Sequence, residues 1–71
     1  MVGRKIKIML NGKPSEVEEG MTLTDLLARM QTEPLKVACE LNQRIVKRAQ
    51  YAETKISEGD EIEILQMIGG G

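Results

Sequence analysis

The residues of this chain best suited to chemistry are its last three, Gly69, Gly70 and Gly71. Glycine has no Cβ and tolerates a wide range of backbone angles, so such a tail can enter a narrow channel in another protein. Three extended residues span about 10 Å. The α-carboxyl group of Gly71 has a reference pKa of about 3.3–3.7, so at neutral pH it is an anion able to attack an activated phosphate. The alternative interpretation is a frayed chain end without function.

Side chains with catalytic potential are scarce elsewhere. The chain has no histidine and a single cysteine, Cys39, so there is no imidazole to activate the thiol and no second cysteine for a disulfide. Cys39 shares an alternating face with Val37 and Leu41, which favours a buried structural thiol. The carboxylates lie in alternating or turn segments typical of a solvated surface, and no nucleophile–base pair can be assembled. We therefore expect no enzymatic activity from the chain alone, and neither a metal nor another cofactor.

Size and charge limit the class of protein. The 71 residues predict one small domain, and they include 10 basic and 11 acidic side chains. This balance, with Tyr51 as the single aromatic residue, argues against binding to nucleic acids or membrane surfaces. Charged residues interrupt the apolar N-terminal segment, which argues against a signal peptide, and no run is long enough to span a membrane. The sequence predicts a soluble, cytoplasmic protein.

The first part of the chain predicts a β-hairpin. In residues 4–10, isoleucine and leucine alternate with lysine and methionine, as in a strand with one buried face. Asn11 and Gly12 follow as a strong signal for a two-residue turn, and residues 13–18 form the return strand.

A short amphipathic helix is predicted after the hairpin. Thr22 is a suitable N-cap, and Asp25 lies three residues later, close to a capping-box arrangement. Pro34 is expected to stop the helix, because proline lacks a backbone donor and clashes with the preceding turn. The apolar stripe follows helical spacing and consists of Leu23, Leu26, Leu27 and Met30.

The second half predicts further strands. Residues 37–41 and 44–46 flank a tight turn, and residues 48–55 form an irregular segment anchored by Tyr51. Residues 61–68 form the last strand.

This order of elements indicates one topology. A hairpin whose first strand pairs in parallel with a later strand, through a helical crossover, packs the helix on one face of the sheet. The predicted fold class is α+β, a β-grasp (ubiquitin-like) mixed sheet packed against one main helix. A domain of residues 1–68 then carries a flexible tail of residues 69–71. The parallel pairing should bring opposite charges together, with Lys5 and Lys7 on the first strand and Glu61 and Glu63 on the last.

The last strand changes its pattern before the tail. In the alternating pattern of the strand, Ile62 and Ile64 occupy positions that face the core. Leu65 and Met67 occupy outward-facing positions, where polar residues are expected. Exposed apolar clusters commonly mark a partner-binding surface, and a β-bulge or an inward turn of the strand end is the alternative. We predict that Leu65, Met67 and Ile68 contact a partner.

From residue 6 to residue 71 the chain resembles the ThiS family, the sulfur carriers of thiamin biosynthesis. The matching segments are Leu-Asn-Gly at residues 10–12, the helix at 23–27, Glu-Leu-Asn-Gln-Arg-Ile-Val-Lys-Arg at 40–48, Glu-Gly-Asp-Glu-Ile at 58–62 and Gly-Gly at 70–71. Two departures are visible: Lys47 stands where the family often has proline, and Gly69 extends the pair of glycines to three. Neither changes the terminal carboxylate.

The resemblance implies a mechanism for the tail. A ThiF-like adenylyltransferase of the ubiquitin-activating type would use ATP to adenylate the Gly71 carboxylate, and a sulfur donor would then replace AMP and leave a thiocarboxylate. A ThiG-like thiazole synthase would accept that sulfur for the thiazole moiety of thiamin. In this scheme Gly71 carries the sulfur, Gly69 and Gly70 provide reach, and the outward apolar residues help to dock the partner. The resemblance implies no cofactor of its own, since ATP belongs to the activating enzyme, and a free monomer is expected.

Three alternatives stay open from the sequence. The small subunit of molybdopterin synthase resembles this fold and also ends in Gly-Gly, but it commonly has a Pro-Pro pair where this chain has Gln66, Met67 and Ile68. A ubiquitin-like modifier would be conjugated to target lysines through Gly71, which also begins with adenylation. The third is a β-grasp interaction module with an inert tail.

Overall fold

The computed structural model of this chain describes residues 3–67, and the predicted boundary between domain and tail after residue 68 lies outside them. Within the described residues, five strands form together with one α-helix and two short 3-10 helices. The strands are β1 (Lys5–Leu10), β2 (Lys13–Glu18), β3 (Val37–Leu41), β4 (Arg44–Val46) and β5 (Glu61–Gln66). The helices are α1 (Leu23–Arg29), η1 (Pro34–Lys36) and η2 (Arg48–Glu53).

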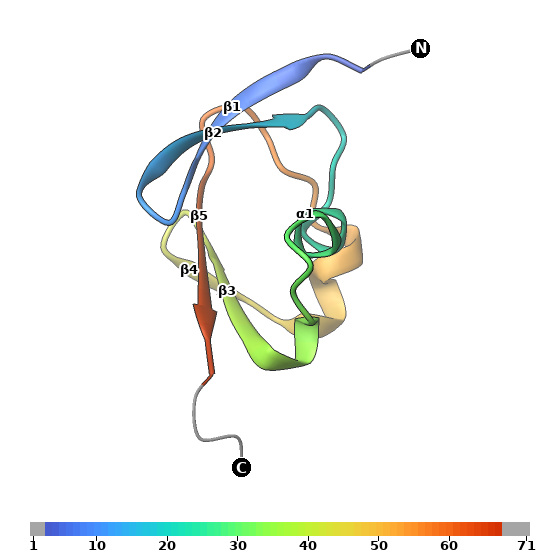
Figure 1. The fold of residues 1–71 in the computed structure, drawn as a ribbon, viewed down its shortest axis with the longest axis vertical. Coiled ribbons are helices and arrows are strands. Elements are labelled where there is room, and N and C mark those ends of the chain that lie inside the picture. The colour runs from blue at the N-terminus through green and yellow to red at the C-terminus, as the bar shows by residue number, and fades with distance from the viewer. Residues whose placement is uncertain (1–2, 68–71) are drawn as a thin grey trace.

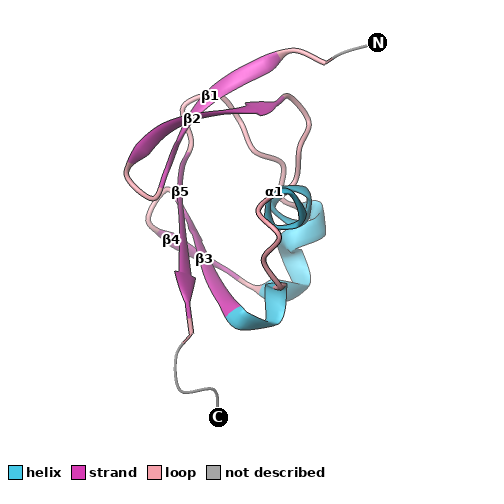
Figure 2. Ribbon diagram, in the orientation of Figure 1, coloured by secondary structure: helices cyan, strands magenta, loops and turns pink. Residues whose placement is uncertain are grey.

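The five strands make one mixed sheet in the order β2-β1-β5-β3-β4. β1 and β5 are parallel, whereas the other neighbouring strands are antiparallel. α1 and η2 lie on the same side of this sheet (Figure 1), and Figure 2 shows the helical segments gathered there, opposite the strands. The predicted α+β fold, a β-grasp with a mixed sheet packed against one main helix, is therefore confirmed.

Both predicted two-residue turns form. Asn11 (φ 51°) and Gly12 (φ 80°) join β1 to β2, and Asn42 (φ 53°) and Gln43 (φ 70°) join β3 to β4. Two successive positive φ values are typical of the type I′ turn, whose twist matches that of antiparallel strands. Asparagine is one of the few residues other than glycine that tolerate this conformation.

The beginning of α1 follows the prediction. Thr22 Oγ1 accepts a hydrogen bond from Asp25 N–H at 3.2 Å, and Asp25 Oδ2 accepts one from Thr22 N–H at 3.0 Å. The two residues form a reciprocal capping box, and the carboxylate lies in the first turn, where the helix dipole favours a negative charge.

The prediction that Pro34 stops the helix is wrong. α1 ends at Arg29, and Gln31 takes a left-handed φ of 58°. The N–H of Thr32 then donates to the carbonyl of Leu27 at 2.9 Å, as in a Schellman cap. Pro34 instead opens η1, a position where a missing backbone donor costs nothing.

Apolar side chains of the sheet and of α1 meet between the two layers. Leu23, Leu26 and Leu27 are buried as predicted, whereas Met30, the fourth member of the stripe, is 36% exposed at the helix C-cap. Each fully buried side chain of this kind contributes about 1.5–3 kcal/mol, so the stripe is a major share of a small core. The core consists of Ile6, Ile8, Val17, Leu23, Leu26, Leu27, Val37, Cys39, Tyr51, Ile56, Ile62 and Ile64.

The predicted pairing of the β1 lysines with Glu61 and Glu63 is wrong. β5 begins level with Met9, which is the Cα partner of Glu61, so both lysines lie before the paired segment. The first half of β1 is therefore paired with β2 alone among the strands. There the lysines lie opposite glutamates, Lys5 opposite Glu18 and Lys7 opposite Glu16.

Two element boundaries differ from the prediction. The sequence pattern predicts an irregular segment over residues 48–55, whereas Arg48–Glu53 forms the 3-10 helix η2. Tyr51 is buried in it and anchors it to the core as predicted. β5 ends at Gln66, and Ile68, the last residue of the predicted strand, lies outside the described part of the chain.

Candidate functional site

The predicted chemical group, the Gly71 carboxylate, lies outside the described residues, as do Ile68, Gly69 and Gly70. What the structure describes is β5, the strand that leads to them, and Met67 directly after it. The geometry of the site therefore consists of the contacts that hold β5 and of the side chains around its end.

β3 holds β5 along its whole length. The antiparallel register runs without interruption from Leu41 opposite Ile62 to Val37 opposite Gln66. Beyond the strand, the N–H of Met67 still donates to the Lys36 carbonyl at 2.9 Å. The regular alternation thus continues to the end of the described residues, and no β-bulge interrupts β5 between Glu61 and Gln66.

Two asparagine side chains fasten β5 to the hairpin turns on either side of it. Asn11 Oδ1 accepts a hydrogen bond from Ile64 N–H at 2.8 Å, and Asn42 Oδ1 accepts one from Glu61 N–H at 2.9 Å. Because β1 turns away at Asn11, the side chain takes the place of a backbone acceptor for β5. Sequence reasoning missed this role, although each asparagine follows a leucine within a segment that carries the family resemblance.

Leu65 and Met67 are exposed, as their parity predicts. The exposed fraction is 49% for Leu65 and 53% for Met67, whereas it is 1% for Ile62 and 9% for Ile64, which face the core. The alternative in which the strand end turns into the core is therefore wrong. Two apolar side chains lie in solvent directly before the segment that ends in the glycines.

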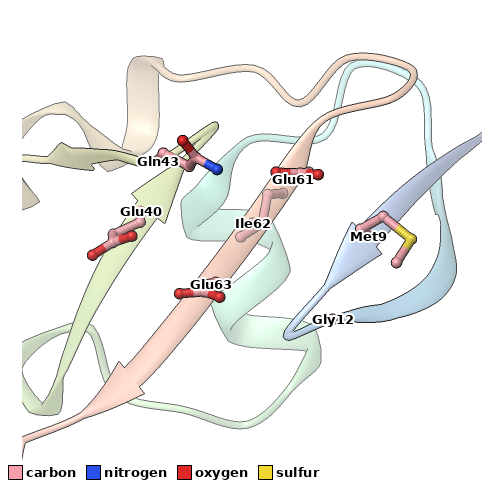
Figure 3. A pocket seen from close by; sticks show the side chains of 7 residues that line it. All are labelled: Met9, Gly12, Glu40, Gln43, Glu61, Ile62 and Glu63. Carbon is pink, nitrogen blue, oxygen red and sulfur yellow. The ribbon is translucent and has the colours of Figure 1, made fainter.

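Carboxylates gather beside these residues on the face of the sheet that points away from α1. Glu40 of β3 and Glu61 and Glu63 of β5 line an open depression of about 190 Å³, to which Met9 and Gly12 also contribute. Figure 3 shows Glu40 on β3 and Glu61 and Glu63 along β5 on the near face of the sheet, with α1 behind it. Among residues 3–67, no group of His, Cys, Asp or Glu is arranged to hold a metal ion. No helix of that stretch is long and apolar enough to cross a membrane.

Cys39 has the structural environment that the sequence predicts. Its side chain is fully buried in the core, and burial raises the pKa of the thiol above its ordinary value. Tyr51 lies in the same core, and its pKa is raised by burial and by the neighbouring Cys39. A thiol that stays protonated and inaccessible is a poor nucleophile, because the thiolate is the reactive form.

Comparisons with known proteins agree with this geometry. The model of the ThiS family matches residues 8–71. The chain is 32% identical over 66 residues to the sulfur carrier protein ThiS of Escherichia coli, covering 93% of this chain and all of that protein. It is 44% identical over 66 residues to part of a thiazole synthase of Magnetococcus marinus, where it spans only 20% of the relative's length.

The fold agrees with a solved structure as well. The thiamine biosynthesis protein ThiS of Geobacter metallireducens superimposes with a TM-score of 0.81 at 33% identity, covering 93% of this chain and all of that one. The family match extends over nearly the whole sequence and includes the closing glycines. The chain therefore belongs to the ThiS family of sulfur carrier proteins.

Proposed function

We propose that this protein carries sulfur as a thiocarboxylate on Gly71 and donates it to the synthesis of the thiazole moiety of thiamin. The observation that carries the proposal is a ThiS family match over residues 8–71 in a chain whose last residues are Gly69, Gly70 and Gly71. A tail without side chains fits the narrow access that an adenylating active site requires.

The proposed chemistry has two steps. An oxygen of the Gly71 carboxylate attacks the α-phosphorus of ATP, pyrophosphate leaves, and an acyl adenylate forms on a ThiF-like activating enzyme. Hydrosulfide delivered by a sulfur donor then attacks the acyl carbon and loses its proton, AMP leaves with the original carboxylate oxygen, and the thiocarboxylate remains. The net change is one carboxylate oxygen exchanged for sulfur. Both steps are catalysed by the partner enzyme, and this chain contributes the acyl group.

Thiazole synthase is the proposed acceptor of the sulfur. The support is that a thiazole synthase of Magnetococcus marinus and one of Paramagnetospirillum magneticum each contain a segment similar to this chain, at 44% and 36% identity. When two domains are joined on one polypeptide, each meets the other at a high effective concentration. When the carrier and the synthase are separate chains, they need a docking surface to come together.

Leu65 and Met67 are the residues that we propose for docking next to the tail, together with Ile68. Leu65 and Met67 are exposed although apolar, and β3 and the asparagine side chains hold the strand that presents them. A rigid strand that ends in exposed apolar side chains can place the following segment in a defined direction on a partner.

The proposal is tested by intact mass spectrometry. The full chain is incubated with the activating enzyme of its own organism, ATP and a sulfur source, and its mass should rise by the difference between sulfur and oxygen. A variant that lacks Gly70 and Gly71 is the matched control. We expect it to keep the thermal stability of the parent chain and to acquire no sulfur. Sulfur on the truncated chain, or none on the full chain, would refute the proposal.

A further inference from the structure

The chain has two asparagine residues, Asn11 and Asn42, and each is the first residue of a two-residue turn beside β5. Their φ values are 51° and 53°, and the residues that follow, Gly12 and Gln43, have φ values of 80° and 70°. Each asparagine Oδ1 accepts a hydrogen bond from a backbone N–H of β5, at 2.8 Å and 2.9 Å. The two turns are therefore a matched pair that differs in the residue after the asparagine.

That following residue controls a reaction of the asparagine side chain. Its backbone nitrogen, after losing its proton, attacks the asparagine Cγ and closes a five-membered succinimide ring, and the side-chain nitrogen leaves as ammonia. Water then opens the ring at one of two carbonyl carbons, which gives either an aspartyl residue or an isoaspartyl residue whose backbone runs through the former side chain. One water is consumed and one ammonia is released. A side chain on the following residue hinders the ring closure, and glycine, which lacks a Cβ, hinders it least.

The turn at Asn11 meets the requirements of this reaction. Asn11 and Gly12 are both exposed, so water reaches them. A Cβ at Gly12 would have no neighbouring atom within 4 Å apart from its own chain neighbours, so the space around the attacking nitrogen is open. At the equivalent position of the other turn, the side chain of Gln43 fills this space. The same backbone conformation is thus combined with a reactive dipeptide in one turn and an unreactive one in the other.

We propose that Asn11 is a deamidation site, at which ring closure with Gly12 yields an isoaspartyl residue that releases β5, the strand that leads to the tail. Asn42, in a turn of the same geometry, is spared because Gln43 follows it. The reaction needs water alone as a co-reactant and is independent of the sulfur chemistry proposed above.

The contact with β5 slows the reaction in the folded chain. The N–H of Asn11 donates to the Ile62 carbonyl at 2.9 Å, and its Oδ1 accepts from the Ile64 N–H at 2.8 Å, so backbone and side chain are both held. Ring closure turns the amide toward Gly12 and breaks the contact with Ile64. Loss of such a hydrogen bond corresponds to a factor of about ten in rate. We therefore expect the folded chain to deamidate about tenfold more slowly than the unfolded chain.

The two products affect β5 differently. An aspartyl residue keeps an acceptor oxygen at the same place and retains the contact with Ile64. An isoaspartyl residue adds a methylene to the backbone of a two-residue turn and leaves its carboxylate directly on Cα, one bond too short for that contact. Both products add a negative charge near Glu61 and Glu63, which line the same depression as Gly12 (Figure 3). Glu63 already lies opposite Glu40, so the added charge increases the repulsion along β5.

The test incubates the purified full chain at mildly alkaline pH, folded and in guanidinium chloride, and follows each asparagine by peptide mapping with mass spectrometry. Deamidation raises the mass of a peptide by the difference between a hydroxyl and an amino group, and methylation by an isoaspartate methyltransferase identifies the isoaspartyl product. In the parent chain we expect modification at Asn11 alone. Gly12→Gln copies the second turn into the first and should abolish it, whereas Gln43→Gly should create a new site at Asn42. Gln43 shows that glutamine tolerates this turn position.

Each step of the inference has an outcome that contradicts it. Equal rates at Asn11 and Asn42 in the unfolded parent chain, or an unchanged rate at Asn11 in Gly12→Gln, would overturn the site. Equal rates in the folded and unfolded parent chain would show that β5 does not protect it. The isoaspartyl form, separated by chromatography, should melt at a lower temperature than Asn11→Asp, which stands for the aspartyl product. Equal melting temperatures would overturn the release of β5.

Discussion

Asn11 offers the sharpest test of how β5 is held, because a single atom of its side chain makes the contact. Asn11 Oδ1 accepts a hydrogen bond from the partly buried N–H of Ile64 at 2.8 Å, and the residue itself has a φ of 51°. Asn11→Ala removes the acceptor and also places an unfavourable residue in a left-handed conformation. Two separate contributions to the free energy of unfolding are therefore lost.

The size of each contribution can be worked out. Leaving the Ile64 N–H without a partner costs about 1–2 kcal/mol at a partly buried position. Alanine in the left-handed region costs about 1 kcal/mol more. The sum of about 2–3 kcal/mol is a large share of the roughly 4–10 kcal/mol that a domain of this length has in total. The melting temperature should fall by about 10–20 °C, at about 4–8 °C per kcal/mol.

Two further variants separate the contributions. Asn11→Gly removes the acceptor but tolerates the positive φ, so it should be intermediate in stability. Asn11→Asp keeps an acceptor oxygen and should lose less than about 1 kcal/mol. Urea and thermal unfolding give the free energies. Amide hydrogen exchange then locates the effect: the Ile64 amide should exchange faster in Asn11→Gly, while the Met67 amide, which donates to the Lys36 carbonyl, should change little. An Asn11→Gly variant with the stability and Ile64 protection of the parent chain would refute this account of β5.

Three further predictions concern docking and the core. Met67→Glu should weaken binding to the activating enzyme by about tenfold without changing the melting temperature, because the Met67 side chain is half exposed and its backbone N–H, which donates to the Lys36 carbonyl, is kept in the variant. Ala49→Glu adds the same charge at an exposed position of η2 on the helical side and is the control; a loss of stability in Met67→Glu would place Met67 in the core. Cys39→Ser should preserve ATP-dependent sulfur loading below its melting temperature, whereas loss of loading in a folded Cys39→Ser protein would give the thiol a chemical role. Burial raises the pKa of Cys39 and Tyr51 in the folded chain, so the unfolded chain ionises first and stability should fall as the pH rises above about 8.5, the reference pKa of cysteine. Cys39→Ala should show a weaker alkaline loss between pH 8.5 and 10 in urea unfolding, and identical pH profiles would contradict the assignment.

The sequence by itself determined the features that depend on local patterns. Alternation in residues 4–10 and 61–67 assigned each side chain to the buried or exposed face, because successive residues of a strand point to opposite sides. Local sequence also predicted the turn at Asn11 and Gly12 and the capping box of Thr22 and Asp25. Each of these features involves residues that are at most three positions apart. These elements, in this order, were enough to predict the β-grasp.

The end of the helix and the strand register were decided by the tertiary structure. Pro34 looked like the stop signal, but α1 ends earlier, because Gln31 takes a left-handed conformation that lets Thr32 cap the helix. The lysines of β1 were expected beside the glutamates of β5. The alternation along a strand determines the face on which a side chain lies, but not which residue lies opposite it. The opposite residue depends on the register, that is, on how far the crossover and the packed helix shift the two strands along each other.

The surroundings of β5 depended most on the three-dimensional arrangement. Asn11 and Ile64 are far apart in sequence, as are Glu40 and Glu63, and no local pattern indicates that either pair meets. The sequence predicted that Gly71 offers a carboxylate and that Leu65 and Met67 face outward. Only the folded sheet brought Asn11 to the backbone of β5 and set two glutamates opposite each other. The physical reason is that hydrogen-bond partners and charge neighbours across a sheet follow from register, which the packing of the whole domain fixes.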